Sequence, residues 1–343
     1  MIIPTRRMMW LTAVPPAVIL AGRGAPTVIV TASILMGLLL AAFVLDGFLA
    51  GRTPYVRLYR GKVFVIKLGG ASTDDAASLR RLVEQVGVLS EFGIRVVLVH
   101  GGGAQTTALA ERLGVPTKLI DGRRVTSPEV LDLAVMAMNG AVNTALLAAC
   151  RATGLPAIGV SGIDAGLVLA RVRDAVPVDF GEVGDIVSVD RTVIDRLLDA
   201  GFLPVVSPLS STADGRVLNV NADTVASSLA SALGAEKLVF VTDTEGLLDD
   251  PRDGASTISY LDLEGVDALE RRGALRGGIV PKIRAARAAL SGGVHRVHLV
   301  GHAHPHGLLI EVFTNEGAGT LLVRSRADLS PAEQGGPAVP GVP

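Results

Sequence analysis

Short, unbroken runs of apolar residues separate longer stretches in which apolar positions recur every three or four residues. Runs rich in Val, Ile and Leu are typical of strands buried on both faces of a parallel sheet. The spacing of Leu79, Leu82, Val83, Val86 and Leu89 is typical of an amphipathic helix. The strand-like runs are residues 62–66, 96–100, 157–160, 204–207, 237–242 and 295–300. This alternation predicts an α/β fold with an open, mainly parallel central sheet flanked by helices, an αβα sandwich. The length of 343 residues suits one large domain or two lobes.

Two glycine turns follow the first two strand-like runs. Lys67 lies at the end of the first run, just before Gly69 and Gly70, and the second run leads into residues 101–103, all glycine. With one helix between them, the two runs predict a β-α-β unit whose strands end at the same sheet edge. Glycines let backbone N–H groups approach an anion, and a lysine adds fixed positive charge. The sequence therefore predicts a phosphate site here, although neither the P-loop nor the dinucleotide-binding spacing is present.

Arg124 precedes a helix that residues 126–129 begin, in the order Thr-Ser-Pro-Glu. That order predicts a capping box with proline in the first turn. An arginine at this place can bind a carboxylate with two hydrogen bonds. The alternative is a surface arginine that pairs with Glu129 or Asp132.

Two further polar features occur in the second half of the chain. Asn219, Asn221 and Asp223 alternate with apolar residues, which places them together if the segment is extended. Asp223 is also a candidate N-cap of the helix that follows. Lys282 comes after the pair Gly277-Gly278 and repeats the arrangement at Lys67. The alternative for Lys282 is an ordinary surface position.

Composition favours small-molecule chemistry. The net charge is −1 and only 3% of the 343 residues are aromatic, so nothing indicates nucleic-acid binding. The single cysteine, Cys150, excludes an internal disulfide and is expected to be a buried apolar residue. No Cys/His spacing predicts a metal site.

Both ends of the chain differ from its body. Residues 24–45 carry no charge over 22 positions, enough to cross a hydrocarbon core of about 30 Å. A membrane helix, an apolar helix in an oligomer contact and translation from a start codon too far upstream all remain open for residues 1–50. Residues 1–20 also resemble a poor signal peptide. The Pro- and Gly-rich residues 327–343 are predicted to form a disordered tail.

Taken together, the motifs resemble the amino acid kinase superfamily and, within it, the acetylglutamate kinases. The resemblance runs from about residue 54 to residue 323. Its motifs are residues 65–70, 99–103, 122–126, 219–223, 242–246 and 277–282. The arginine loop, residues 122–126, and the Asn-x-Asn-x-Asp element, residues 219–223, narrow the resemblance to the acetylglutamate kinases.

The resemblance implies phosphoryl transfer from ATP to the side-chain carboxylate of N-acetyl-L-glutamate in arginine biosynthesis, with Mg²⁺ bound through the nucleotide. It implies that Lys67 and Lys282 supply charge to the moving phosphoryl group and that Asp223 orients them. The other implied sites are phosphate binding by Gly69 and Gly70, acetylglutamate binding by Gly102, Gly103, Arg124 and Asn219, and ATP binding by Asp243, Thr244, Glu245, Gly246, Leu247, Leu248, Ala274, Leu275 and Arg276.

The resemblance also implies organisation and regulation. Residues 51–62 resemble the end of the N-terminal helix that links dimers into a hexamer, and residues 305–317 resemble an arginine effector segment in which Glu311 is a candidate ligand. Residues 63–215 correspond to an acetylglutamate-binding lobe and residues 216–326 to an ATP-binding lobe. A cytoplasmic enzyme inhibited by L-arginine is expected, with a membrane tether through residues 24–45 left open.

Some positions depart from the family pattern. Thr144 and Ile163 stand where lysines are usual, and residues 301–303 read Gly-His-Ala where Asp-Gly-Arg is usual. The last departure bears on effector binding more than on catalysis. Three alternatives remain: a kinase of a related acyl-amino acid such as N-acetylaminoadipate, the kinase-like half of an acetylglutamate synthase, and a non-catalytic arginine-sensing module.

Overall fold

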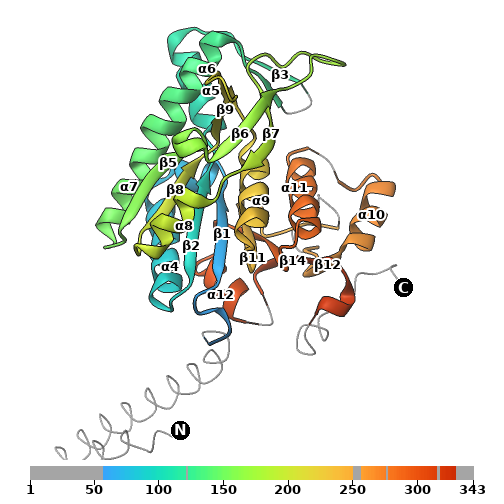
Figure 1. Ribbon diagram of the computed structural model, residues 1–343. Coiled ribbons are helices and arrows are strands. Elements are labelled where there is room, and N and C mark those ends of the chain that lie inside the picture. Colours follow the sequence, from blue (N-terminus) through green and yellow to red (C-terminus); the bar gives the residue numbers. More distant parts are fainter. Residues whose placement is uncertain (1–56, 121–122, 250–255, 276, 315–316, 330–343) are drawn as a thin grey trace, which may run out of the picture. The chain divides into compact units, whose positions relative to one another are not determined.

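The structure is a computed structural model that describes residues 57–120, 123–249, 256–275, 277–314 and 317–329 (Figure 1). The apolar segment 24–45 and residues 330–343 of the predicted tail lie outside the described residues. The predictions of a membrane helix and a disordered tail therefore stay predictions.

An eight-stranded sheet forms the centre of the molecule. Its order is β12 (Tyr260–Asp262), β14 (Gly319–Val323), β13 (Arg296–Gly301), β11 (Lys237–Thr242), β1 (Val63–Leu68), β2 (Arg95–His100), β8 (Leu203–Ser207) and β5 (Ala157–Ser161). The strands from β13 to β5 are parallel, and β14 runs antiparallel to β13. The mainly parallel sheet predicted from the apolar runs is confirmed.

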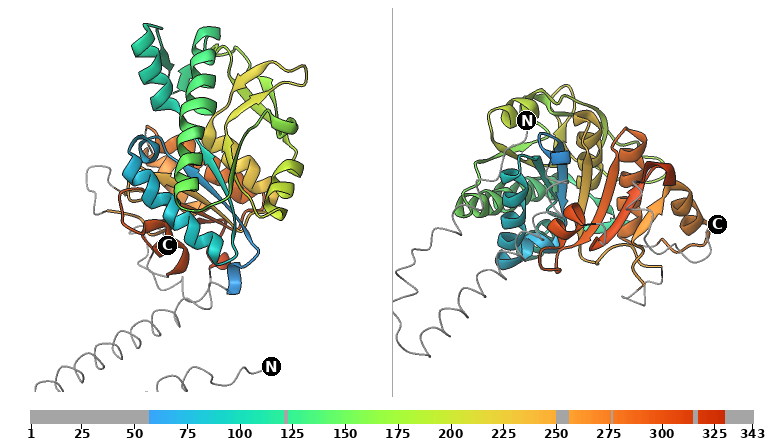
Figure 2. Two further views of the ribbon diagram at one scale, coloured as in Figure 1. Left: turned by 90° about the vertical axis from the view of Figure 1, so that its left-hand side faces the viewer. Right: turned by 90° about the horizontal axis from the view of Figure 1, so that it is seen from below.

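Helices cover both faces of this sheet (Figures 1 and 2). One layer contains α4 (Ala76–Glu91), α7 (Asn143–Ala152) and α12 (Gly307–Phe313), and the other contains α8 (Thr192–Asp199), α9 (Ala222–Leu233) and α11 (Ile279–Ser291). α10 (Leu263–Arg271) follows β12. The division into two lobes at residue 215 stays a prediction, because the central sheet continues through both proposed lobes.

Smaller β elements stand beyond the carboxyl ends of β1 and β2 (Figure 1). A four-stranded sheet has the order β10 (Val217–Asn219), β9 (Leu209–Ser211), β6 (Val168–Val172) and β7 (Gly184–Val189). A two-stranded ribbon consists of β3 (Lys118–Ile120) and β4 (Arg123–Val125). None of these short strands is among the strand-like runs recognised in the sequence. They place polar side chains above the edge of the central sheet.

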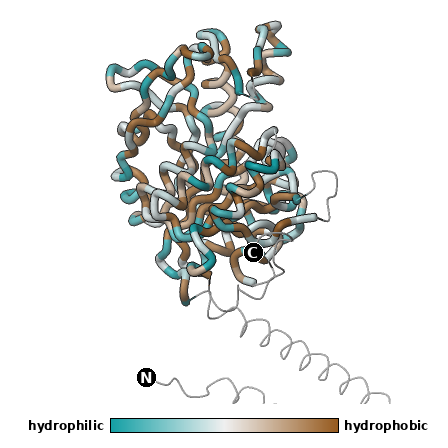
Figure 3. The backbone as a smooth tube through the Cα atoms, turned by 90° about the vertical axis from the view of Figure 1, so that its right-hand side faces the viewer, coloured by the Kyte–Doolittle hydropathy of each residue, from teal (hydrophilic) through white to brown (hydrophobic). Residues whose placement is uncertain are grey.

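The central strands are the hydrophobic core. Phe64, Ile66 and Leu68 of β1 and Phe240 of β11 have no exposed surface, and each such side chain stabilises the fold by about 1.5–3 kcal/mol on burial. Figure 3 shows the hydrophobic stretches of the chain concentrated through the middle of the molecule. Because the strands are buried on both faces, they cannot shift without exposing apolar surface, so their carboxyl ends hold a site rigidly.

One long helical segment lies beside the site. α6 (Pro128–Val135), a π-helical segment (Met136–Val142) and α7 run together over residues 128–152. Ser127 is the N-cap and its Oγ accepts a hydrogen bond from the Val130 N–H at 3.3 Å, so the cap is one residue later than the predicted Thr126. Within the described residues, this helix is long and apolar enough to cross a membrane, a test that core helices of soluble proteins also pass, and 44% of its window is buried in the protein.

Candidate active site

The two lysines singled out in the sequence meet at one carboxylate. The Lys67 Nζ lies 2.7 Å from Asp223 Oδ1, and the Lys282 Nζ lies 3.7 Å from Asp223 Oδ2. Lys67 is at the carboxyl end of β1, Asp223 is in the first turn of α9, and Lys282 is in the first turn of α11. Side chains that are more than 150 residues apart in sequence therefore converge at one edge of the sheet.

Asp223 is buried, with 5% of its surface exposed. Burial opposes ionisation of its carboxyl group, but the charges of Lys67 and Lys282 outweigh burial and hold its pKa below the usual value. The prediction that Asp223 is the N-cap of α9 is wrong. Asn221 caps that helix through a 3.0 Å hydrogen bond from the Thr224 N–H, which leaves the Asp223 carboxylate for the lysines.

The first glycine turn serves mainly to bring strands together. The Gly69 N–H donates to Val241 O at 3.0 Å, and a Cβ on Gly69 would lie 2.8 Å from that oxygen. The sheet uses this donor in the structure, and phosphate binding by Gly69 stays a prediction. Gly70 lies in the cavity wall and precedes the short helix α3 (Ala71–Asp74).

The second glycine turn is the N-terminus of α5 (Gly103–Leu113). The first N–H groups of a helix have no partner within it, and together with the helix dipole they favour an anion. Buried His100 supports this turn: its Nδ1 lies 2.7 Å from Gly101 O, and its Nε2 lies 3.1 Å from the Asn143 amide nitrogen. Burial lowers the pKa of His100 to about 4, so the ring is neutral at pH 7. Neutral His100 therefore donates through Nδ1 and accepts through Nε2.

Gly102 is required by close packing. A Cβ at this position would lie 2.6 Å from Met138 Cγ, and Met138 belongs to the π-helical segment. π-helical turns inside α-helices occur frequently at functional sites. Here the extra residue in the turn directs Met138 onto the glycine turn.

Arg124 lies against the same turn. Its Nη2 donates to Gly103 O at 2.8 Å and to Thr107 Oγ1 at 2.6 Å. Its Nη1 has no hydrogen-bond partner within the described part of the chain, and burial lowers the pKa of the group. Arg124 therefore does not make the alternative pair with Glu129 or Asp132, and its Nη1 stays buried without a partner while the residue lines the cavity.

Asn219 is held through Thr126. The Asn219 Nδ2 donates to Thr126 Oγ1 at 3.1 Å. The backbone of Thr126 also bonds with Phe180 O and the Glu182 N–H, so the loop before β7 is fixed over the arginine loop. Neither the importance of Thr126 nor the position of Phe180 was apparent from local sequence.

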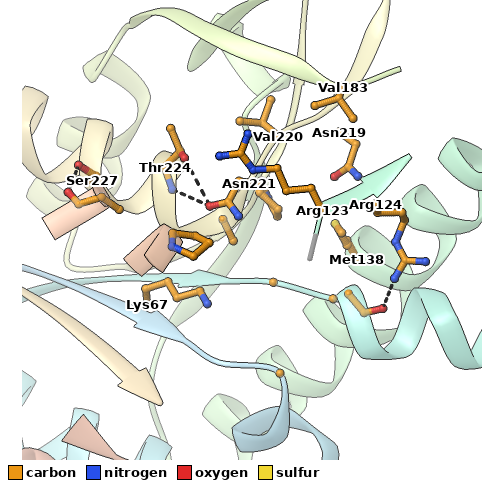
Figure 4. A pocket seen from close by; sticks show the side chains of 18 of the residues that line it. Lys67, Arg123, Arg124, Met138, Val183, Asn219, Val220, Asn221, Thr224 and Ser227 are labelled. Atoms are coloured by element: carbon orange, nitrogen blue, oxygen red, sulfur yellow. Dashed lines mark hydrogen bonds between the residues drawn. The ribbon is translucent and has the colours of Figure 1, made fainter. Parts of the chain in front are cut away.

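A cavity of about 610 Å³ connects these groups (Figure 4). None of the described Asp or Glu residues lines it. Its lining includes Lys67, Gly102, Gly103, Arg124, Met138, Asn219 and Asn221, together with three arginines that sequence reasoning missed, Arg123, Arg173 and Arg284. The cationic lining makes this cavity suitable for a small anion.

The segments predicted to bind ATP lie outside this cavity. Asp243, Thr244 and Glu245 are exposed after β11, and a Cβ on Gly69 would lie 3.9 Å from Asp243 Oδ1. This segment therefore adjoins the first glycine turn. Leu247 is buried in the core at 4% exposed, its N–H donates to Thr320 Oγ1 at 2.8 Å, and its carbonyl accepts from the Ile258 N–H at 2.8 Å.

The remaining predicted ATP residues are partly placed. Gly246 is buried, Leu248 is half-buried, and Ala274 and Leu275 pack against the core. Arg276 lies outside the described residues.

Glu311, the candidate effector ligand, is buried far along the chain from the lysine site. Its Oε1 lies 2.7 Å from His298 Nδ1, and its Oε2 accepts a hydrogen bond from the Ala318 N–H at 2.7 Å. His298 in turn lies 3.0 Å from the buried Lys237 Nζ. Both carboxylate oxygens of Glu311 are thus occupied within the chain.

The two residues that stand where lysines are usual in the family have different surroundings. Ile163 packs beside the apolar cluster of Ala134, Met138 and Leu209, whereas Thr144 is exposed on α7. Neither residue lies at the Lys67–Asp223–Lys282 cluster. Cys150 is buried, as predicted, and burial raises the pKa of its thiol to about 11.

Comparisons with known proteins identify the family of the chain. Residues 62–301 match the amino acid kinase family. The acetylglutamate kinase of Myxococcus xanthus is 47% identical over 284 residues, which cover 80% of this chain and 92% of that protein.

Solved structures are also similar to this chain. The N-acetylglutamate synthase of Neisseria gonorrhoeae in complex with coenzyme A and N-acetyl-glutamate has a TM-score of 0.73 at 29% identity, covering 81% of this chain and 63% of the synthase. Its complex with coenzyme A and L-arginine has a TM-score of 0.72 at 28% identity, covering 80% and 64%. This chain thus spans less than two thirds of the synthase. The chain belongs to the amino acid kinase family and, within it, to the acetylglutamate kinases.

Proposed function

We propose that this protein transfers the γ-phosphoryl group of ATP to the side-chain carboxylate of N-acetyl-L-glutamate and forms N-acetyl-L-glutamyl 5-phosphate. The observation that carries the proposal is the convergence of Lys67 and Lys282 on the buried Asp223, beside a cavity with a cationic lining. The acetylglutamate kinase relatives support the choice of acceptor.

The acceptor carboxylate is already ionised at pH 7, so the reaction needs no general base. It needs positive charge on the migrating phosphoryl group and alignment of the two oxygens. Lys67 and Lys282 approach from β1 and α11, and Asp223 fixes both ammonium groups. Their charges stabilise the transition state, in which negative charge is spread over the phosphoryl oxygens.

The acceptor is held on the side of the cavity formed by α5 and β4. Arg124 and Asn219 line the same wall. The Gly102–Gly103 turn directs helix N–H groups toward the acceptor carboxylate. These contacts place the reacting oxygen near Lys67.

The nucleotide is assigned to the segments after β11 and before α11, next to the first glycine turn. No group of three His, Cys, Asp or Glu side chains that could hold a metal ion occurs among the described residues. Mg²⁺ would be held mainly by nucleotide phosphates and water, which is how Mg²⁺ commonly binds. When bound, Mg²⁺ neutralises charge on the phosphates.

A coupled ADP-release assay tests the acceptor. N-acetylglutamate, glutamate, aspartate and N-acetylaminoadipate are compared at equal concentration. The highest kcat/KM is expected for N-acetylglutamate. Faster turnover of N-acetylaminoadipate favours a related acyl-amino acid kinase, and turnover of none of the four favours a binding module.

We further propose that L-arginine inhibits the enzyme through the buried cluster of Lys237, His298 and Glu311. A guanidinium group suits a carboxylate, and to bind Glu311 it takes the place of the bonds that this carboxylate makes with His298 and the Ala318 N–H. The related synthase was crystallised with L-arginine. The cluster contacts the proposed oligomer segment, residues 51–62, through Tyr59, since Lys237 Nζ lies 5.0 Å from the centre of the Tyr59 ring. A cytoplasmic hexamer assembled through the segment before Tyr59 belongs to the same proposal.

Inhibition is tested by titrating arginine into the wild type and into Glu311→Gln. The wild type is expected to lose activity at millimolar arginine, and the variant is expected to retain it. Equal wild-type activity with and without arginine rejects the regulatory proposal. Light scattering distinguishes a hexamer from smaller assemblies.

A further inference from the structure

Arg123 lies in the wall of the cavity but has no role in the account above. It is the first residue of β4, directly before Arg124. Consecutive residues of a strand point to opposite sides, and Figure 4 shows the Arg124 side chain directed toward α5 while Arg123 extends across the cavity toward Val220 and Asn221. The ribbon therefore presents two guanidinium groups to different parts of one site.

The charge of Arg123 is not neutralised by any carboxylate in the described part of the chain. Two other cations of the cavity differ in this respect. Lys67 pairs with Asp223, and Arg173 binds Asp185 at 2.6 Å. Arg123 is exposed, so its guanidinium is free to contact a ligand that enters the cavity.

The acceptor assigned under the proposed function is a dicarboxylate, and only its side-chain carboxylate reacts. That carboxylate is placed near Lys67 and the glycine turns, which leaves the α-carboxylate at the other end of the molecule. Nη2 of Arg124 already bonds Gly103 O and Thr107 Oγ1, and Nη1 is buried. An anion in a cavity without acidic lining is stabilised further by a second guanidinium.

We propose that Arg123 binds the non-reacting α-carboxylate of the acceptor and makes the site selective for dicarboxylates. This inference rests on the proposed function and adds a specificity-determining residue to it. Arg123 extends from the ribbon toward the part of the lining that contains Asn221. Its contact fixes the end of the acceptor that does not react.

The inference is tested by comparing two acceptors in the wild type and in Arg123→Gln. N-acetylglutamate is compared with its α-amide, which keeps the reacting carboxylate and lacks the α charge. Arg123→Gln is expected to lower kcat/KM for N-acetylglutamate about 10- to 100-fold, as for loss of a hydrogen bond to a charged group. The same variant is expected to change kcat/KM for the α-amide by no more than about 2-fold. Calorimetry of N-acetylglutamate binding without nucleotide is expected to show the same loss.

Two matched variants complete the experiment. Arg112→Gln removes one exposed positive charge on α5, outside the cavity lining, and is expected to leave both acceptors unaffected. Arg284→Gln removes another cavity arginine, on α11, and is expected to preserve the preference for the dicarboxylate.

The inference is overturned if Arg123→Gln loses kcat/KM equally for both acceptors or for neither. It is also overturned if Arg284→Gln, and not Arg123→Gln, loses the preference for N-acetylglutamate over its α-amide. Wild-type turnover is measured first. Its absence with N-acetylglutamate overturns the proposed function, whereas an active wild type with an unchanged preference in Arg123→Gln overturns only this inference.

Discussion

Asp223→Asn isolates the contribution of the buried carboxylate between the two lysines. The substitution keeps the size of the side chain and removes its charge. The side chains of Lys67 and Asp223 are only 8% and 6% exposed, so water cannot replace the lost partner of Lys67. Lys282 is 21% exposed and is expected to turn toward solvent.

The expected cost is large because a buried charge is left unpaired. Breaking a buried ion pair by removing one partner destabilises a protein by about 3–5 kcal/mol. The pKa of Asp223 is lowered on folding, so its contribution to stability is present above pH 3.8, the usual value for Asp, and is lost as the pH falls through the folded-state pKa. The difference between wild type and variant should therefore be full at pH 7 and disappear in strong acid.

Urea unfolding at pH 7 measures this difference. Asp195→Asn is the matched control, because its pair with Arg191 is a partly exposed i,i+4 contact on α8 and is expected to contribute about 0.3–0.5 kcal/mol. The double variant Lys67→Met/Asp223→Asn is expected to cost less than the sum of its parts, since it removes both charges. A loss below about 1 kcal/mol in Asp223→Asn, or additive costs in the double variant, refutes the reasoning.

Three further outcomes are expected. Lys282→Ala lowers kcat far more than it raises either KM, which steady-state kinetics measures, and an unchanged kcat removes Lys282 from the mechanism. Gly102→Ala raises the KM for N-acetylglutamate because its Cβ meets Met138 Cγ at 2.6 Å, and adding Met138→Ala restores part of the affinity; failure of this rescue argues against a steric cause. Acid is expected to lower the free energy of unfolding between pH 6.5 and about 4, because buried His100 is held neutral in the folded protein. The expected loss over that window is roughly 3 kcal/mol. Urea unfolding of His100→Gln should show a smaller acid dependence than the wild type, and an equal dependence contradicts this assignment.

Local pattern predicted the elements whose burial is uniform. The apolar runs at β1, β2 and β11 have no polar face, so a parallel sheet buried on both sides was the consistent interpretation. The parallel pairing of β1 with β2 places Leu68 opposite His100 and brings both glycine turns to one edge. The convergence of Lys67 and Lys282 follows from that topology.

Other features depend on contacts between distant segments. The Gly69 N–H is used by Val241, which no local rule reveals because a glycine turn looks the same whether its donors are free or paired. The β3–β4 ribbon is short and largely exposed, so its apolar pattern is weak. Arg123 was therefore overlooked beside Arg124, although two adjacent arginines before a helix N-terminus were visible in the sequence.

Trapping the acyl phosphate with hydroxylamine tests the central claim most directly. Wild-type protein with ATP, Mg²⁺ and N-acetylglutamate is expected to form the γ-hydroxamate of the acceptor. Lys67→Met and Lys282→Met are each expected to reduce the rate of trapping by about 10²–10³-fold while calorimetry still detects acceptor binding. No hydroxamate from the wild type, or an undiminished rate in both lysine variants, contradicts the account.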